Sequence, residues 1–231
     1  MHIGGLQKMT LLDYPGMVAC TVFLDGCNFR CPFCHNPDLV VAPKPEPVVS
    51  EREFFAFLSQ REGFLDGVCI TGGEPMLNRG LEPFIKEIRD RGYLVKLDTN
   101  GSFPDRLQHL VASRLVDYVA MDIKNSKEHY GTTIGLPSYD TKEVEQSVAI
   151  LMEGDVPYEF RTTLVREFHT RSAMHAIGEW LKGCRAYYLQ NFVDSGNLLG
   201  KEVMTAFSAE EMVSYKNLLK RYIKPVYIRG L

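Results

Sequence analysis

Residues 25–37 read DGCNFRCPFCHNP, and this stretch carries Cys27, Cys31 and Cys34 at C-x3-C-x2-C spacing. Three thiolates on one short loop suit an iron–sulfur cluster, which normally takes four protein sulfurs. With only three sulfurs close by, one iron is left open to coordinate a small molecule. The spacing therefore predicts a reaction centre more than a centre for electron transfer alone.

Structural zinc is the main alternative for this cysteine loop. A closed zinc site needs four ligands, and a C-x2-C pair usually recurs as a second pair further along the chain. The sequence has no second pair, and His35 is the neighbour that could complete a Cys3His site. The remaining cysteines stand singly in apolar stretches, where a small buried hydrophobe is the expected role: Cys20, Cys69 and Cys184.

Composition excludes several classes of protein. Hydrophobic residues make up 45% and charged residues 24% of the 231 residues, which is an ordinary globular balance for one core. The net charge of -3 offers no electrostatic case for binding nucleic acid or an anionic membrane. The first residues lack the apolar region of a signal peptide, and no stretch is long enough to span a membrane. We expect a cytoplasmic protein, and in that reducing compartment its six cysteines fit thiolate ligation better than crosslinking.

Short β-branched or aromatic runs alternate with helical patterns, which predicts an α/β fold with a parallel sheet. The expected strands are residues 18–24, 68–71, 94–97, 118–123, 158–164, 187–192 and 226–228. Capping boxes begin two expected helices at Ser50 and Ser208, and apolar stripes mark three more at 81–88, 144–151 and 174–181. Gly92 is the expected end of the 81–88 helix, and residues 42–49 are expected to form an extended connection.

Polar motifs follow several of these expected strands. GGEP begins at Gly72, DTNG at Asp98, DIK at Asp122 and QNF at Gln190. Because the carboxyl ends of parallel strands face one way, and active sites are built there, these motifs are expected to converge with the cysteine loop on one rim.

Each motif also has a structural interpretation. GGEP is typical of a turn, DTNG of an Asx turn or helix N-cap, and Asp122 with Lys124 of a surface ion pair. Asp122, however, ends an apolar run, where an unpaired charge is costly unless it faces a polar cleft. Arg161 interrupts the run YEFRTTLV in the same way, which predicts an anion or a carboxylate partner for its guanidinium.

Taken together, GLQKMTLLDYPG, CNFRCPFCHNP, ITGGEP, LDTNG and MDIK, in this order, resemble the radical S-adenosylmethionine (SAM) enzymes. Within them the chain is most similar to the glycyl-radical-enzyme activating proteins, particularly the activators of anaerobic ribonucleoside-triphosphate reductase, with those of pyruvate formate-lyase as close cousins. The resemblance implies one radical SAM domain over residues 1–231. An N-terminal extension, 1–17, would precede a partial, TIM-like (β/α)6 barrel, 18–231, open on one side.

The resemblance also implies a site. Cys27, Cys31 and Cys34 would hold a [4Fe-4S] cluster on which SAM binds. Contacts to SAM would come from Gly72, Gly73 and Glu74 (amino group), Lys124 and Arg161 (carboxylate), Asp122 (ribose) and Phe33 (adenine). Alternatively, Asp122 would help Asp98 and Thr99 to bind a monovalent cation, as in the pyruvate formate-lyase cousin. Asn191 stands where the pyruvate formate-lyase activator has a histidine.

The implied activity is reductive cleavage of SAM at the cluster, followed by removal of a hydrogen atom from a glycine of a partner enzyme. A flavodoxin or ferredoxin would supply the electron. No catalytic side chain is needed beyond the cluster and SAM, so the other histidines are expected to be surface or core residues: His2, His109, His129, His169 and His175. Alternatives are activation of another glycyl radical enzyme, radical SAM chemistry on a small molecule, and a non-catalytic zinc-binding α/β module.

Overall fold

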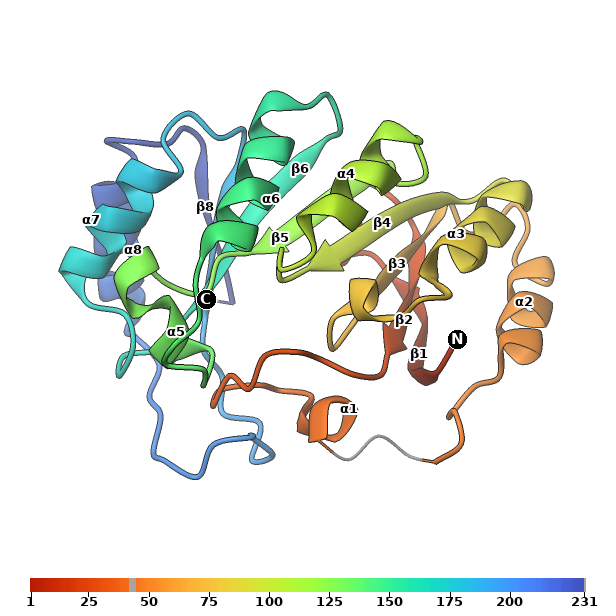
Figure 1. Cartoon of the computed structure of the whole chain (residues 1–231), viewed down its shortest axis with the longest axis horizontal. Coiled ribbons are helices and arrows are strands. Elements are labelled where there is room, and N and C mark those ends of the chain that lie inside the picture. Colours follow the sequence, from red (N-terminus) through yellow and green to blue (C-terminus); the bar gives the residue numbers. More distant parts are fainter. Residues whose placement is uncertain (42–44, 231) are drawn as a thin grey trace. The chain divides into compact units, whose positions relative to one another are not determined.

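The structure is a computed structural model that describes residues 1–41 and 45–230 (Figure 1). The strands in this part of the chain are β1 (Ile3–Thr10), β2 (Ala19–Leu24), β3 (Gly67–Gly72), β4 (Leu94–Thr99), β5 (Tyr118–Asp122), β6 (Tyr158–Leu164), β7 (Tyr187–Asn191) and β8 (Val226–Arg229). The helices are α1 (Pro37–Val41), α2 (Glu51–Ser59), α3 (Leu81–Asp90), α4 (Pro104–Ala112), α5 (Tyr130–Thr133), α6 (Lys142–Glu153), α7 (Arg171–Trp180) and α8 (Ala209–Leu219), with short 3-10 turns η1 (Pro75–Leu77) and η2 (Lys127–His129).

The chain forms two compact units. Unit 1 comprises Met1–Asn28, Asp38–Thr99 and Phe103–Ala120, and unit 2 comprises Phe29–Pro37, Asn100–Ser102 and Met121–Leu231. Within each unit, strand order follows chain order. The expectation of a single radical SAM domain stays a prediction.

In unit 1, β1 pairs antiparallel with β2, and β2, β3 and β4 run parallel to one another. Helix α3 packs on β4, and it meets helix α2 through aromatic rings, with those of Phe54 and Phe84 stacked at 5.2 Å. Val95 and Leu97 of β4 are completely buried. Because side chains alternate along a strand, Lys96 and Asp98 of the same strand lie on the opposite face.

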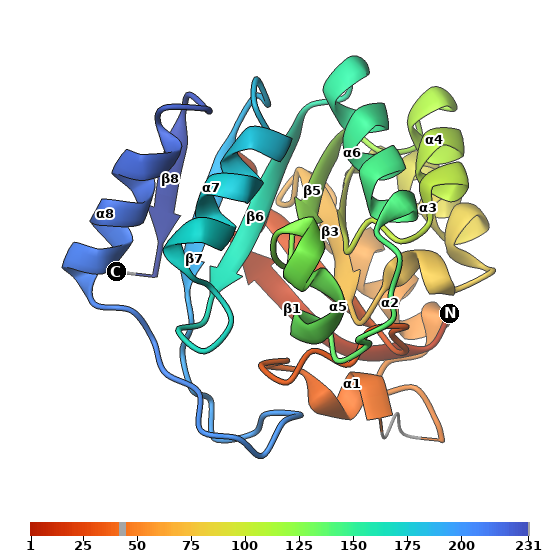
Figure 2. The ribbon, with the colours of Figure 1, turned by 60° about the vertical axis from the view of Figure 1, so that its left-hand side comes forward.

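In unit 2, β6, β7 and β8 form a parallel sheet in continuous register. Helix α8 packs on β7 and β8 and against α7, and Figure 2 shows both helices alongside these strands. Thr170 caps α7 by accepting a hydrogen bond from the backbone N–H of Ala173. In unit 2 the strands β7 and β8 are thus supported by helix α8, which in turn packs against α7.

The seven expected strands are confirmed, and their ends shift by a residue or two. Both capping boxes are present, and Gly92 has a φ of 84°, as the expected helix end requires. Of the expected extended connection, residues 42–44 lie outside the described residues. Among the described helices, none combines the length and hydropathy needed to cross a bilayer.

Strand β1 was not predicted, because IGGLQKMT has two glycines and three polar residues in place of a β-branched run. Its backbone pairing with β2 decides its structure, so much of the expected N-terminal extension is part of the unit 1 sheet. Helix α4 was also not predicted. It begins with Pro104 in its first turn, which fits the fixed φ of proline, and buries Leu107 and Leu110.

Candidate functional site

The cysteine loop follows β2 and is fixed by its backbone. Gly26, with a φ of 90°, turns the chain out of the strand, and its N–H donates to the carbonyl of Leu39 at 2.7 Å. Further along, the N–H of Arg30 donates to Ile134 at 2.9 Å, and the N–H of Cys34 donates to Cys31 at 3.0 Å. Both ends of the loop are thereby anchored, each within its own unit.

None of the six cysteines forms a disulfide, and the three of the loop fit a cluster best. Burial raises the pKa of Cys20 and of Cys184 to about 12, so these two thiols stay protonated and are poor ligands. Cys27 and Cys34 are partly exposed. Within the described residues, no three His, Cys, Asp or Glu side chains are already gathered as metal ligands, so the ligand set rests on thiol chemistry and spacing.

His35, the ligand that a zinc site would need, has a structural role in unit 2. Its Nε2 lies 2.7 Å from the carbonyl oxygen of Val193, and its ring lies 5.7 Å from that of Phe192. These contacts do not support the Cys3His alternative.

Gly72 and Gly73 let the loop after β3 lie directly against the start of the cysteine loop. A Cβ at Gly72, whose φ is 126°, would lie 2.2 Å from the carbonyl oxygen of Leu24, and one at Gly73 would lie 2.0 Å from that of Gly26. In this close approach the N–H of Gly73 donates to Leu24 at 2.9 Å, and the N–H of Glu74 donates to Gly26 at 2.7 Å. The two predicted motifs therefore touch within unit 1.

The carboxylate of Glu74 is completely buried and fixes the GGEP loop. Its Oε1 accepts hydrogen bonds from the backbone N–H of Met76 and from the hydroxyl of Thr99, both at 3.0 Å. The first bond caps η1, and the second ties the loop to the end of β4. Glu74 thus joins two of the predicted motifs through its side chain.

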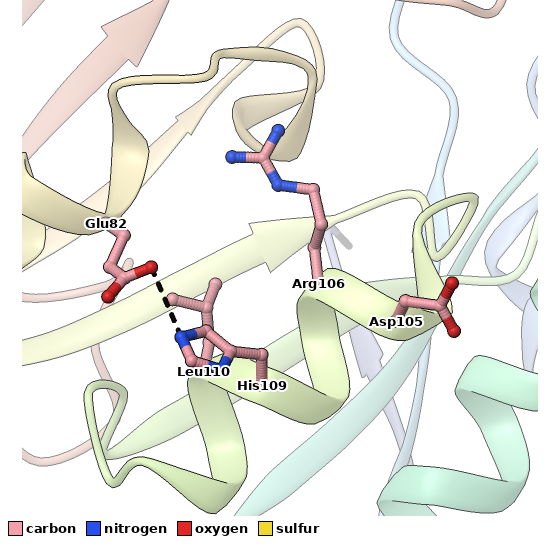
Figure 3. A pocket seen from close by; sticks show the side chains of 5 residues that line it. All are labelled: Glu82, Asp105, Arg106, His109 and Leu110. Atoms are coloured by element: carbon pink, nitrogen blue, oxygen red, sulfur yellow. Dashed lines mark hydrogen bonds and ion pairs between the residues drawn. The ribbon is translucent and has the colours of Figure 1, made fainter.

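Arg106 of α4 supports the same loop, a role that the sequence pattern did not reveal. Its guanidinium donates to the carbonyl of Met76 and, at 2.6 Å, to that of Asn78. Arg106 also lines a surface hollow with four other residues, Glu82, Asp105, His109 and Leu110 (Figure 3). None of the predicted site residues lines this hollow, so it is not the candidate site.

At the end of β4, Asp98 accepts a hydrogen bond from Lys96, which is 1% exposed and forms an ion pair with it. The thiol of Cys69 lies 3.7 Å from the carboxylate. Lys96 was missed as a candidate. The sequence pattern that could have revealed it is a lysine and an aspartate two residues apart in a mainly apolar strand, because residues at this spacing lie on the same face.

In unit 2, Asp122 lies between two cations. Its Oδ1 accepts from Nε of Arg161 at 2.9 Å and its Oδ2 from Nζ of Lys124 at 3.0 Å. Burial opposes ionisation of this carboxyl, but the charges and hydrogen bonds of Arg161 and Lys124 outweigh it and lower the pKa to about 2. The predicted carboxylate partner of Arg161 is thus Asp122, which is ionised at any physiological pH.

Other predicted contacts also lie in unit 2. The ring of Phe33, 4% exposed, packs 5.8 Å from that of Phe168. The side-chain amide of Asn191 donates to the carbonyl of Phe207 at 2.8 Å and accepts from its N–H at 3.1 Å. The structure therefore shows a role for Asn191 in holding the segment before α8, and its contact with SAM stays a prediction.

His169 is a core residue, as expected. It is 1% exposed, its Nδ1 accepts from the N–H of Val165 at 3.0 Å, and its Nε2 lies 2.8 Å from the carbonyl of Lys124. Burial lowers the pKa of this imidazole. A neutral His169 donating from Nε2 therefore fixes the backbone at Lys124, whose side chain pairs with Asp122.

We expect Asp122→Asn to keep the cluster and to weaken SAM binding about tenfold, the usual worth of one hydrogen bond to a charged group. Because the pKa is about 2, the carboxylate contribution is present above that value and lost only as the pH falls through it. The loss should thus be the same at every pH near neutrality, as calorimetric titration with SAM would measure.

The matched control is Asp140→Asn, which removes an exposed carboxylate paired with Lys142 at 3.0 Å. Its SAM affinity should equal that of the wild type. Unchanged affinity in Asp122→Asn, or a loss that varies with pH around neutrality, would remove Asp122 from the site.

The chain belongs to the radical SAM superfamily, whose model matches residues 21–176. This range contains the cysteine loop, GGEP, DTNG, DIK and Arg161. The chain is therefore a radical SAM enzyme, and membership implies a [4Fe-4S] cluster and SAM as its cofactors.

Two curated proteins of related sequence are named as activating enzymes. The chain is 27% identical over 240 residues to a Methanocaldococcus jannaschii protein named "Putative glycyl-radical enzyme activating enzyme MJ1227", covering 99% of this chain and 96% of that one. It is 34% identical over 105 residues to the pyruvate formate-lyase-activating enzyme of Staphylococcus epidermidis, covering 43% of this chain and 41% of that one.

Solved structures share the fold. A domain of a pyruvate-formate lyase-activating enzyme from Bacteroides vulgatus aligns with a TM-score of 0.58 at 19% identity, covering 71% of this chain and 99% of that one. Streptococcus suis SuiB, bound to its precursor peptide, aligns with a TM-score of 0.71 at 11% identity, covering 91% of this chain and 48% of that one. The predicted α/β fold with an open parallel sheet is confirmed.

Proposed function

We propose that this radical SAM enzyme activates a glycyl radical enzyme. The observation that carries the proposal is the likeness to the Methanocaldococcus jannaschii relative, which extends over 99% of this chain and 96% of that one. The shared length means that the likeness includes the regions outside the cysteine loop as well as the cofactor motifs. The partner that we propose is the anaerobic ribonucleoside-triphosphate reductase, with a flavodoxin or ferredoxin as electron donor, in the cytoplasm.

The residues of the chain would divide the work as follows. Cys27, Cys31 and Cys34 would hold the cluster, which when bound supplies the electron that cleaves SAM. The backbone of Gly72 and Gly73, fixed by the buried Glu74, would receive the amino group of SAM. All of these groups belong to loops whose backbones are anchored by hydrogen bonds, so they are preorganised for binding.

The charged residues of unit 2 would bind the remaining polar groups. Arg161 and Lys124 would lie near the SAM carboxylate, and Asp122, held ionised between them, would accept a hydrogen bond from the ribose. Phe33 would pack against the adenine, and Asn191 would add a polar contact. A cation pair around one carboxylate leaves a net positive charge, which suits an anionic group of the ligand.

A second candidate is radical SAM chemistry on a small molecule. The observation in its favour is 33% identity over 125 residues to the 7-carboxy-7-deazaguanine synthase of Methanopyrus kandleri. That likeness covers 45% of this chain and 48% of the relative, whereas the likeness to the activating-enzyme relative covers almost all of both chains. We therefore favour the protein substrate.

The test is to incubate the reduced enzyme and SAM, without oxygen, with each candidate glycyl radical enzyme and to record electron paramagnetic resonance spectra. We expect a glycyl radical doublet with the anaerobic ribonucleotide reductase, and no doublet when its radical-forming glycine is replaced by alanine. A doublet only with pyruvate formate-lyase would move the assignment to that partner. SAM cleavage without a protein radical on any candidate would favour the small-molecule alternative.

A further inference from the structure

Lys96 is a charged side chain inside the sheet of unit 1 that the proposed function does not use. Its side chain is 1% exposed, and its ammonium forms an ion pair with the carboxylate of Asp98, which is 12% exposed. Burying an ammonium is costly unless it is paired and hydrogen-bonded. The Lys96–Asp98 ion pair is therefore part of the interior of unit 1 and not a surface contact.

The position of Lys96 follows from the register of the sheet. In the parallel pairing of β3 with β4, Cys69 lies opposite Lys96, and the thiol is 3.6 Å from the ammonium. Asp98, two residues further along β4, lies on the same face and nearer the carboxyl end of the strand. The ammonium of Lys96 therefore places a positive charge at the end of β4, beside Asp98.

This arrangement does not fit the monovalent cation that the resemblance implies beside Asp98, Thr99 and Asp122. Asp98 is already neutralised by Lys96, and Asp122 by Arg161 and Lys124. The hydroxyl of Thr99 is committed to Glu74. A partly buried carboxylate that already has an ammonium or guanidinium against it has little to gain from a potassium or sodium ion, because binding that ion would place two cations together.

We propose that Lys96 is an internal substitute for a monovalent cation, which neutralises the Asp98 carboxylate so that this enzyme binds SAM independently of potassium or sodium. The inference rests on the proposed SAM site but not on the proposed protein partner. Removal of the ammonium would leave the Asp98 carboxylate at a partly buried position that attracts a small cation. Lys96→Met, which keeps an unbranched apolar stem, should then acquire a dependence on monovalent cations that the wild type lacks.

The experiment measures SAM affinity and thermal unfolding of the reconstituted holoenzyme in potassium chloride and in tetramethylammonium chloride at equal ionic strength. For the wild type we expect dissociation constants that agree within about twofold between the two salts. For Lys96→Met we expect at least about tenfold weaker SAM binding and a lower unfolding temperature in tetramethylammonium, with both restored by potassium.

The double variant Lys96→Met/Asp98→Asn is the matched control, because it lacks the carboxylate that would attract the ion. Its SAM affinity and unfolding temperature should be the same in both salts. The proposal is overturned if wild-type SAM affinity requires potassium, a result that needs no folded variant. It is also overturned if potassium restores nothing in Lys96→Met, or restores the double variant equally. Failure to form a glycyl radical on any partner would leave these results unaffected.

Discussion

Cys31→Ala is expected to leave the purified protein with almost no iron, in place of about four irons per chain, and to abolish SAM cleavage. The two remaining thiolates of the loop cannot hold a [4Fe-4S] cube. Neither Cys20 nor Cys184 can take the place of Cys31 as the third ligand. Burial raises the pKa of both Cys20 and Cys184 to about 12, so neither supplies a thiolate near neutral pH. Iron and sulfide analysis after anaerobic reconstitution, with chromatography of the cleavage products, measures both effects.

Cys184→Ala is the matched control for this prediction. Cys184 is 2% exposed, and the substitution removes only one sulfur from the core. We expect full iron content and full SAM cleavage from this variant. Four irons per chain in Cys31→Ala would refute the ligand assignment, and one zinc with no iron in the wild type would favour the zinc-binding module.

Gly73→Ala is expected to have the second largest effect. The new methyl group would lie 2.0 Å from the carbonyl oxygen of Gly26 and 3.1 Å from Cβ of Cys27. Since both atoms belong to the loop that begins the cluster site, relief of this clash must move the cysteine loop or the GGEP loop. We expect a loss of about 1–3 kcal/mol in the free energy of unfolding, as for other overpacked sites, and SAM binding weakened more than about tenfold. Denaturant unfolding and calorimetric titration measure the two effects.

Gly5→Ala separates this clash from the general cost of replacing a glycine in unit 1. The nearest atom to a Cβ at Gly5 is Cδ2 of Phe23 at 3.5 Å, an ordinary contact, and the position lies in β1. SAM binding should be unchanged in this variant. Equal SAM affinity in Gly73→Ala and the wild type would show that the contact between the two loops does not position the site.

Much of the fold followed from local patterns. Alternation of apolar runs with capped helices predicted β2 to β8, and the capping boxes at Ser50 and Ser208 were confirmed because their hydrogen bonds close within four residues of chain. Strand β1 was missed because its composition carries no strand pattern. Its pairing with β2 depends on contacts between distant residues, which local propensity does not record.

The candidate site divides in the same way. The C-x3-C-x2-C spacing and the motifs after successive strands were visible in the sequence, because chemistry fixes residue types and short intervals. The hydrogen bond from Thr99 to Glu74, the clamp of Arg106 on the loop after GGEP and the ammonium of Lys96 beside Asp98 were not visible. The first two contacts join residues that are far apart in the sequence. The third depends on which face of strand β4 is buried, and the sequence does not record either property.

The sequence by itself determined that three thiolates are available on one loop, and the family match with residues 21–176 agrees with the motifs that surround it. Only the tertiary structure decided which charges are neutralised inside the protein, because the pairing of Asp98 with Lys96 and of Asp122 with Arg161 depends on burial and register. The sequence alone does not show whether a carboxylate is buried or which cation lies beside it. The packed sheet fixes both, and we propose that it thereby makes an added monovalent cation unnecessary at Asp98.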